Sequence, residues 1–223
     1  MAIAKPSTRA QKKQATRTRI LKAASRALEQ QGFEETNIRD LAKQCGVAAG
    51  TVLLHFHDKQ DLMFCCFFDD LERRSRDAVE TASHASLEED LVALFQALFD
   101  FHAARPKLAP ALLREAWFAA PPWADRLRTQ EALLAGHILE LARQAQERGD
   151  LPARANADLV PPAFFSFHRQ AMLGWLEDPD AEPCRRFRQM LREYLCGDEK
   201  KKAKGGKSKK RKNKKSKKHP EDA

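Results

Sequence analysis

The sequence predicts an all-α protein, with an N-terminal three-helix helix-turn-helix domain, a C-terminal helical domain and about nine helices in all. Three observations support this fold class. The 223 residues include thirteen Phe but one Tyr, with many Ala and Leu and few β-branched runs, a composition that favours helices over strands. Apolar residues recur at three- and four-residue intervals in successive segments. Gly and Pro stand between these segments, where helices end.

The chain begins with a basic segment, residues 1–15, that contains four Lys/Arg and no acid. We expect a flexible arm whose cations either contact a polyanion or stay solvated. Helix one is expected over 16–31, because Ile20, Ala24 and Leu28 mark one apolar face and Gly32 follows.

Helices two and three define the N-terminal domain. A cap at Thr36 or Asn37 starts helix two, and Gly46 can end it because glycine adopts a left-handed conformation at little steric cost. Helix three is expected over 48–56. This arrangement predicts a helix-turn-helix motif at about 37–56, in which the second helix lies in the DNA major groove. An ordinary helical hairpin in an all-α core is the alternative.

A specific sequence pattern extends across these helices. It consists of Gly32-Phe33 after helix one, the run TNIRDLAKQCGV over 36–47, and its continuation G-T-x-x-x-x-F-x-x-K over 50–59. With this pattern, about a quarter of the chain resembles the DNA-binding domain of the TetR/AcrR family of one-component transcriptional regulators. Two positions depart from the family pattern: Leu53 replaces a usual Tyr that reaches a phosphate, and Ala48 replaces a frequent Ser or Thr. Both departures remove a donor to the DNA backbone.

The outward face of helix three supplies the expected DNA contacts. Thr51 can donate to a phosphate or a base edge, and the small Ala49 and Gly50 allow close approach to thymine methyl groups. The resemblance implies that Arg39 reaches a base and that Lys59 binds phosphate. The candidate DNA-binding residues are Arg39, Ala48, Ala49, Gly50, Thr51, Leu53, Leu54, His55 and Lys59. A solvated face is the alternative for each polar member.

Asp58 is expected to cap a long helix four over 59–83, which can connect the two domains. Further helices are expected over 87–104, 109–119, 124–148, 158–177 and 183–196. The expected domains are the arm 1–15, the helix-turn-helix domain 16–75, an effector-binding and dimerisation domain 76–197 and a disordered Lys-rich tail 198–223.

The last two helices are more apolar than a monomer of this size requires. The resemblance implies that they pair with their copies in a second subunit to form a four-helix bundle. Burial within one subunit is the alternative. The dimer-interface candidates are Phe165, Met172, Trp175, Leu176, Phe187, Met190, Leu191 and Leu195.

Aromatic residues in helices five to eight could line the effector cavity that the resemblance implies, for an apolar or amphipathic small molecule. The pocket candidates are Phe95, Phe99, His102, Trp117, Phe118, Trp123, His137, Phe164, Phe167 and His168. Ordinary core packing is the alternative for each. The three histidines among them lack the short spacing of metal ligands, so no metal and no cofactor is expected.

Five cysteines occur without any C-x-x-C spacing, so a disulfide framework is not expected. The adjacent Cys65 and Cys66 could sense oxidants or soft metals, but the neighbouring Phe residues favour buried thiols that act as small hydrophobes. The chain has no long apolar run and no apolar core segment near its start, so a cytoplasmic protein is expected.

The net charge of +9 is unevenly distributed. Residues 1–60 hold eleven Lys/Arg against five Asp/Glu, residues 198–223 hold thirteen against four, and the segment between them is acidic. Basic ends and an acidic middle are typical of a chain whose ends meet nucleic acid. The Lys-rich tail could add sequence-independent attraction to phosphates or simply stay solvated.

These features predict a homodimeric regulator, a repressor released from a palindromic DNA operator by a small effector. A nucleoid-associated DNA binder without an effector is the alternative. An enzyme is not expected, because no Gly-rich phosphate loop, G-x-S-x-G elbow or H-E-x-x-H motif occurs.

Overall fold

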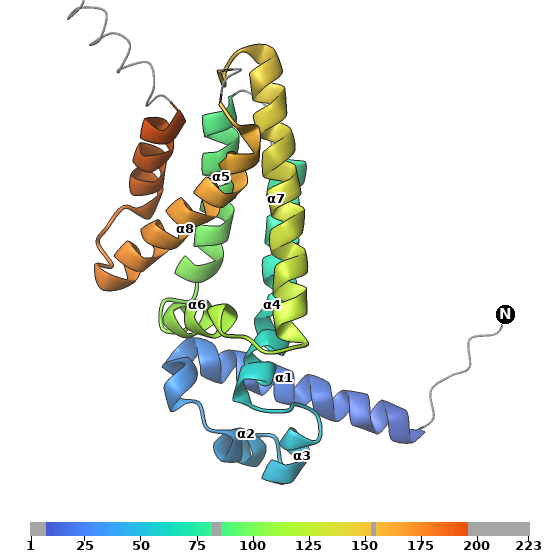
Figure 1. Cartoon of the computed structure of the whole chain (residues 1–223). Helices are drawn as coiled ribbons and strands as arrows, with labels where there is room; N and C mark the ends of the chain where they lie inside the picture. Colours follow the sequence, from blue (N-terminus) through green and yellow to red (C-terminus); the bar gives the residue numbers. More distant parts are fainter. Residues whose placement is uncertain (1–7, 82–85, 153–154, 196–223) are drawn as a thin grey trace, which may run out of the picture. The chain divides into compact units, whose positions relative to one another are not determined.

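The computed structural model describes residues 8–81, 86–152 and 155–195. These residues are helical without any strand, as the sequence predicts (Figure 1). The elements are α1 (Thr8–Glu35), α2 (Ile38–Gln44), α3 (Ala49–Leu53), α4 (Lys59–Glu80), α5 (Leu87–Ala103), α6 (Ala109–Trp117), α7 (Trp123–Arg148), a 3-10 turn (Ala157–Leu159), α8 (Val160–Glu177) and a last helix over 183–195. Among the described residues, no helix is long and apolar enough to cross a membrane.

The chain divides into two compact units. The first contains the described residues of Met1–Ala82 together with Ala93–Ile138, and the second contains those of Ser83–Val92 and Leu139–Ala223. The expected boundary at 75/76 therefore differs from the structural division, because α6 and most of α5 and α7 belong with the helix-turn-helix domain. The Lys-rich tail and Cys196 lie outside the described residues.

Helix α1 begins at Thr8, eight residues earlier than predicted, so the second half of the expected arm is helical. Residues 8–15 are exposed and carry no apolar stripe, so apolar periodicity could not reveal them. At the other end, Gly32 breaks the helix with φ +86°, and the Thr36 hydroxyl donates to the Gly32 carbonyl at 2.7 Å. A Cβ atom at Gly32 would lie 3.0 Å from the carbonyl oxygen of Lys107.

The turn between α2 and α3 has the chemistry that the sequence predicts. The Asn37 side chain caps α2 by accepting from the Arg39 backbone N–H at 2.7 Å, and Gly46 adopts φ +60°. Helix α3 ends at Leu53, three residues earlier than predicted. The backbone N–H groups of His55 and Phe56 both donate to the Val52 carbonyl, which makes a tight turn instead of another helical turn.

One apolar core runs through the first unit. It joins Ile20 and Leu28 of α1, Val52 of α3 and Phe64 of α4, all at most 3% exposed. The same core includes side chains from beyond α4, which are Phe101, Leu108, Ala111, Leu112 and Trp123. The helix-turn-helix domain therefore shares its core with α5, α6 and the start of α7.

The second unit buries part of the expected dimer surface. Met172, Phe187 and Leu191 are at most 1% exposed, and the Phe187 ring packs edge-on against Phe164 with centroids 5.3 Å apart. These three dimer-interface candidates therefore lie in the core of their own subunit, which is the alternative given for them above. The five remaining candidates are partly exposed: Phe165, Trp175, Leu176, Met190 and Leu195.

Candidate nucleic-acid interface

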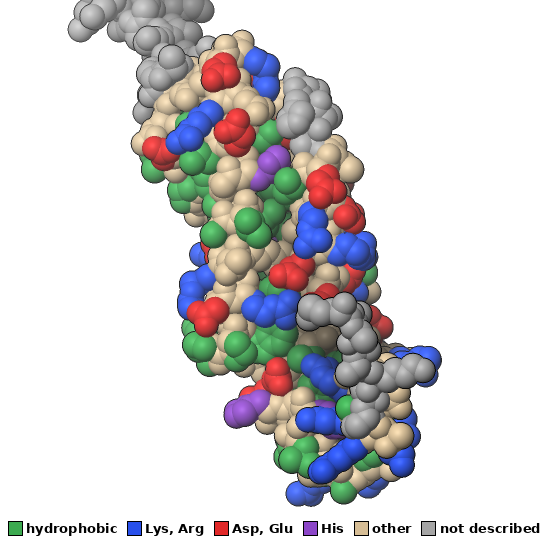
Figure 2. All heavy atoms as spheres, turned by 90° about the vertical axis from the view of Figure 1, so that its right-hand side faces the viewer, with side chains coloured by type: hydrophobic (Ala, Val, Ile, Leu, Met, Phe, Trp, Pro, Cys, Tyr) green, Lys and Arg blue, Asp and Glu red, His purple; other side chains and the backbone are tan. Residues whose placement is uncertain are grey.

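Helix α3 exposes the side chains that the sequence assigns to DNA binding. Val52 is fully buried, whereas Leu53 and Leu54 expose 51% and 81% of their surface. Ala48 and Gly50 are exposed, and Thr51 is partly exposed. No side chain caps α3, which is the structural consequence of Ala48 at that position. Lys and Arg side chains gather at the same end of the molecule (Figure 2). This surface suits an anionic partner approached at close range.

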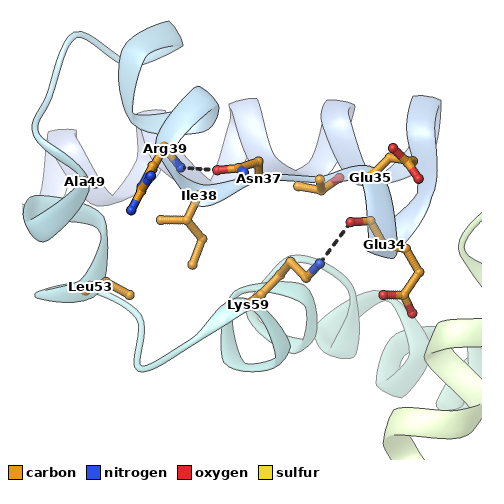
Figure 3. Close-up of a pocket in the computed structure, with 9 residues that line it drawn as sticks. Glu34, Glu35, Asn37, Ile38, Arg39, Ala49, Leu53 and Lys59 are labelled. Atoms are coloured by element: carbon orange, nitrogen blue, oxygen red, sulfur yellow. Dashed lines mark hydrogen bonds between the residues drawn. The ribbon is translucent and has the colours of Figure 1, made fainter.

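A hollow separates α3 from the start of α4 (Figure 3). Its lining residues are Glu34, Glu35, Thr36, Asn37, Ile38, Arg39, Ala49, Leu53 and Lys59. Ile38, Ala49 and Leu53 supply apolar lining, and the cations of Arg39 and Lys59 are on different helices. Four predicted DNA-binding residues therefore line the same hollow: Arg39, Ala49, Leu53 and Lys59.

Lys59 has a structural role that the sequence did not reveal. Its ammonium donates to the backbone carbonyls of Phe33 at 2.7 Å and Glu34 at 3.3 Å, and it lies 4.3 Å from the Phe33 ring centroid. A cation in this place satisfies carbonyl groups at the end of α1. One of the three ammonium protons remains for another acceptor. Phosphate binding by Lys59 stays a prediction.

His55 lies in a cationic environment at the end of α3. Partial burial, together with the positive charges of Lys13 and Arg17, lowers the pKa of its ring. His55 is therefore neutral at pH 7 and offers one N–H donor rather than a positive charge. Lys13 and Arg17 belong to α1, so this helix adds cations beside α3.

The turn into α4 is fixed by two carboxylates. Asp58 caps α4 as predicted, by accepting from the Asp61 backbone N–H at 2.7 Å. Burial opposes ionisation of Asp58, but this hydrogen bond and the nearby His57 ring hold its pKa below the ordinary value. Asp61 in turn accepts from the His57 backbone N–H at 2.8 Å and from the Trp123 indole N–H at 2.8 Å. The start of α7 is thereby bonded to the turn that follows α3.

Further contacts tie α4 to helices beyond it. Arg105 forms an ion pair with Asp70 at 2.7 Å, and its guanidinium lies between the rings of Phe67 and Phe101 at 5.0 and 4.7 Å. The Gln130 amide donates to the Ser75 hydroxyl at 2.8 Å.

Arg126 makes the same kind of contact from α7. It pairs with Asp69 and Glu72 and covers the Phe68 ring at 4.2 Å. These partners are more than 50 residues apart in sequence, so no local pattern could have identified them. These contacts join the first turns of α7 to α4.

The pocket candidates occupy different environments. In the first unit, Phe95 is buried and stacks with Phe99 at 6.3 Å, and His102 is also buried. Trp123 belongs to the shared core, whereas Phe118 is 79% exposed. Trp117 is 43% exposed and His137 is partly buried.

In the second unit, Phe164 is buried and stacks with His168 at 6.4 Å, and Phe167 packs against Tyr194. Within the described residues, no group of three His, Cys, Asp or Glu could hold a metal ion.

The adjacent cysteines do not have activated thiols. Burial raises the pKa of Cys65, and burial with the neighbouring Cys65 raises the pKa of Cys66 to about 12. Reactive cysteines instead need a stabilised thiolate. These values favour the expectation that both side chains act as small hydrophobes.

Known proteins show the same pattern. The family model described as bacterial regulatory proteins of the tetR family matches residues 20–64. The HTH-type transcriptional regulator UidR of Escherichia coli K12 is 26% identical over 191 residues, which are 82% of this chain and 93% of UidR. The HTH-type transcriptional regulator TtgR of Pseudomonas putida is 28% identical over 177 residues, 75% of this chain and 83% of TtgR.

The fold is also similar to that of a solved structure. Bacillus subtilis FadR in complex with stearoyl-CoA has a TM-score of 0.61, with 18% identity and with 81% of this chain and 98% of that chain covered. At this identity the likeness concerns the fold. The helix-turn-helix geometry, the family model and the two regulators agree: residues 20–64 carry the DNA-binding segment of the tetR family, and the chain is similar over most of its length to TetR-family transcriptional regulators.

Proposed function

We propose that this regulator is a homodimeric repressor that binds a palindromic operator and is released by a small apolar or amphipathic effector. The observation that carries the proposal is the outward face of α3. Gly50, Leu53 and Leu54 are exposed there and Thr51 is partly exposed, while Val52 of the same helix is buried in the core. Small and methyl-bearing side chains suit thymine methyl groups, and the Thr51 hydroxyl can bond a base edge or a phosphate.

A dimer is supported by the second unit. Phe165, Trp175 and Leu176 on α8, and Met190 and Leu195 on the last helix, remain partly exposed although they are large and apolar. Pairing with the same surface of a second copy would cover them and give a two-fold symmetric molecule. Such a dimer presents two copies of α3 to two half-sites of a palindrome.

Release by an effector is supported by the contacts along α4. The Trp123–Asp61 and Gln130–Ser75 contacts join α4 to α7, and the Arg105–Asp70 ion pair joins α4 to the loop that follows α5. A ligand that favours one arrangement of α5 and α7 would shift α4, and with it the turn after α3. The FadR structure named above contains stearoyl-CoA, which makes long-chain acyl-CoA thioesters the first compounds to test as effectors.

Selection of bound duplexes from a random pool tests DNA binding. We expect a palindromic consensus and a binding stoichiometry of two chains per site. Thr51→Glu should abolish binding to the selected site, because it places a negative charge among phosphates. Thr18→Glu, with the same charge change at an exposed position of α1, is the matched control. A pool without any consensus would instead indicate the nucleoid-associated alternative.

Titration of the protein–operator complex tests release. Stearoyl-CoA, free CoA and stearate are added separately, and dissociation is followed by the fluorescence anisotropy of labelled operator. Release by the thioester and not by CoA supports an acyl-CoA effector. If no apolar or amphipathic compound from a broad library lowers affinity, the effector-release part of the proposal is refuted, while operator binding stands.

A further inference from the structure

Helix α3 carries almost no hydrogen-bonding side chain. From Ala48 to Leu54, Thr51 is the one polar residue, and it is partly exposed. The side chains that distinguish bases by paired hydrogen bonds are Arg or Lys on guanine and Asn or Gln on adenine. None of these four residue types occurs in α3 or at the positions directly before and after it. Apolar contact is therefore the main means by which α3 can distinguish bases.

Two adjacent leucines are exposed at the end of α3. Leu53 is 51% exposed and Leu54 is 81% exposed, which is the highest value among the large apolar side chains of the described residues. Apolar side chains stabilise a fold only when they leave water, so Leu54 contributes little to folding. An exposed apolar pair on a functional face instead fits a partner that covers it in a complex.

Gly50 leaves open space beside Leu54. The Leu54 backbone N–H donates to the Gly50 carbonyl at 3.0 Å, so the two residues are four apart on one face of the helix. A Cβ atom at Gly50 would have no neighbour within 4 Å. A small apolar group can therefore approach Leu54 across the glycine without meeting another side chain. We name this open apolar surface of Leu54 and Gly50 the methyl shelf.

Cations from three other helices lie around α3. The charges of Lys13 and Arg17 on α1 reach the His55 ring and lower its pKa. Arg39 on α2 and Lys59 on α4 line the hollow beside α3 (Figure 3). The base edges of the DNA major groove likewise lie between two phosphate backbones. An apolar surface among cations therefore fits these base edges better than it fits an apolar protein surface.

We propose that the methyl shelf reads the C5-methyl group of a pyrimidine in each half-site of the operator. This inference rests on the proposed operator binding. Thymine is the one unmodified base that presents an apolar group, its C5 methyl, in the major groove. Because α3 has no side chain that reads the hydrogen-bond pattern of the pair, the methyl group decides the affinity at this position. The shelf therefore accepts 5-methylcytosine in place of thymine and rejects uracil.

The expected size of the effect follows from the burial of one methyl group. Removing one such group from water changes an association constant by about fourfold. A symmetric operator presents the group twice, so loss of both should weaken binding of the dimer by about 15-fold.

The test changes the operator and the protein together. Each thymine of the selected half-site is replaced in turn, symmetrically in both half-sites, by uracil, which keeps the base pairing and removes the methyl group. At the position where uracil weakens binding, the T·A pair is then replaced by 5-methylcytosine·G and by cytosine·G. Wild type should prefer thymine to uracil, and 5-methylcytosine to cytosine, by about 15-fold in both comparisons.

Two protein variants carry the same substitution. Leu54→Ala should reduce both preferences to about twofold or less, because the larger part of the apolar contact is gone. Leu133→Ala, at a 72% exposed position of α7, should keep them. Both positions are exposed, so neither change should alter the stability by more than a little. Circular dichroism checks that both variants are folded.

A thymine preference that keeps its wild-type value in Leu54→Ala would overturn the inference. So would a selected half-site without any A·T pair, or wild-type protein that binds the thymine and uracil duplexes equally at every position. Failure of the proposed function would look different, because the wild-type protein would then bind scrambled and selected duplexes equally.

Discussion

Acidification between pH 7 and pH 5 should destabilise the protein through one buried histidine. His102 in α5 is 6% exposed, and its Nδ1–H donates to the Leu98 carbonyl at 2.9 Å. Burial, opposed by this hydrogen bond and assisted by the charge of Arg105, lowers its pKa from 6.5 to about 4. A histidine with a lower pKa in the folded state stabilises the fold above pH 6.5, and this stability is lost as the pH falls toward 4.

The magnitude follows from the two pKa values. With 6.5 in the unfolded chain and about 4 in the folded protein, the free energy of unfolding should fall by about 2 kcal/mol between pH 7 and pH 5. Carboxylates with lowered pKa values, such as Asp70 and Glu88, contribute mainly at still lower pH, because their ordinary values are 3.8 and 4.5. The window from pH 7 to pH 5 therefore separates the histidine contributions from those of the carboxylates. His55, whose pKa is also lowered, contributes in the same window, so a variant at position 102 is needed to assign the effect.

Urea unfolding at fixed protein concentration measures this effect in wild type and in His102→Asn. Asn keeps a donor near the position of Nδ1 but cannot be protonated in this range. The variant will have its own stability at pH 7, so the compared quantity is the change between pH 7 and pH 5. That change should be about 2 kcal/mol smaller in the variant. Identical pH dependence in the two proteins would refute the assignment to His102.

Three further substitutions and one labelling experiment test other features of the structure. Trp123→Phe keeps the apolar ring but removes the N–H donated to Asp61, and should lower the free energy of unfolding by about 1.5 kcal/mol in urea. Asp58→Ala removes the α4 cap and should cost about 1 kcal/mol, measured as a lower thermal midpoint, with no loss if the cap is irrelevant. Gly32→Ala should cost at least about 1 kcal/mol, because φ is +86° there, and an unchanged urea midpoint would contradict that geometry. Cys66, whose pKa is about 12, should react with iodoacetamide at pH 8 only on unfolding, and rapid labelling of the folded protein would argue for a sensor thiol.

Local sequence chemistry was sufficient to predict the helix-turn-helix motif. The Asn37 cap, the left-handed Gly46 and the Asp58 cap each depend on residues within four positions of one another, and all three are confirmed. The break in α1 at Gly32 was predicted for the same reason. The start of α1 at Thr8 was missed because a helix that contacts no core has no apolar period.

Contacts between distant residues could not be predicted from the sequence. Lys59 was assigned to phosphate from its motif position, but its bonds to Phe33 and Glu34 depend on where α1 ends in space. The apolar period of the last helices showed which face is buried, but not whether a second subunit or the same chain covers it. Phe187 and Leu191 proved to be covered by their own chain.

The shared core of the first unit limits how the DNA-binding segment can be exchanged between homologous proteins. A chimera joined after α4 would lack Trp123, whose ring packs against Phe64 and Phe68. It would also lack Arg105, the ion-pair partner of Asp70. A junction placed within α7 near Ile138, where the compact unit ends, keeps these partners together. Recombination that transfers operator specificity should therefore carry α5, α6 and the first half of α7 with it.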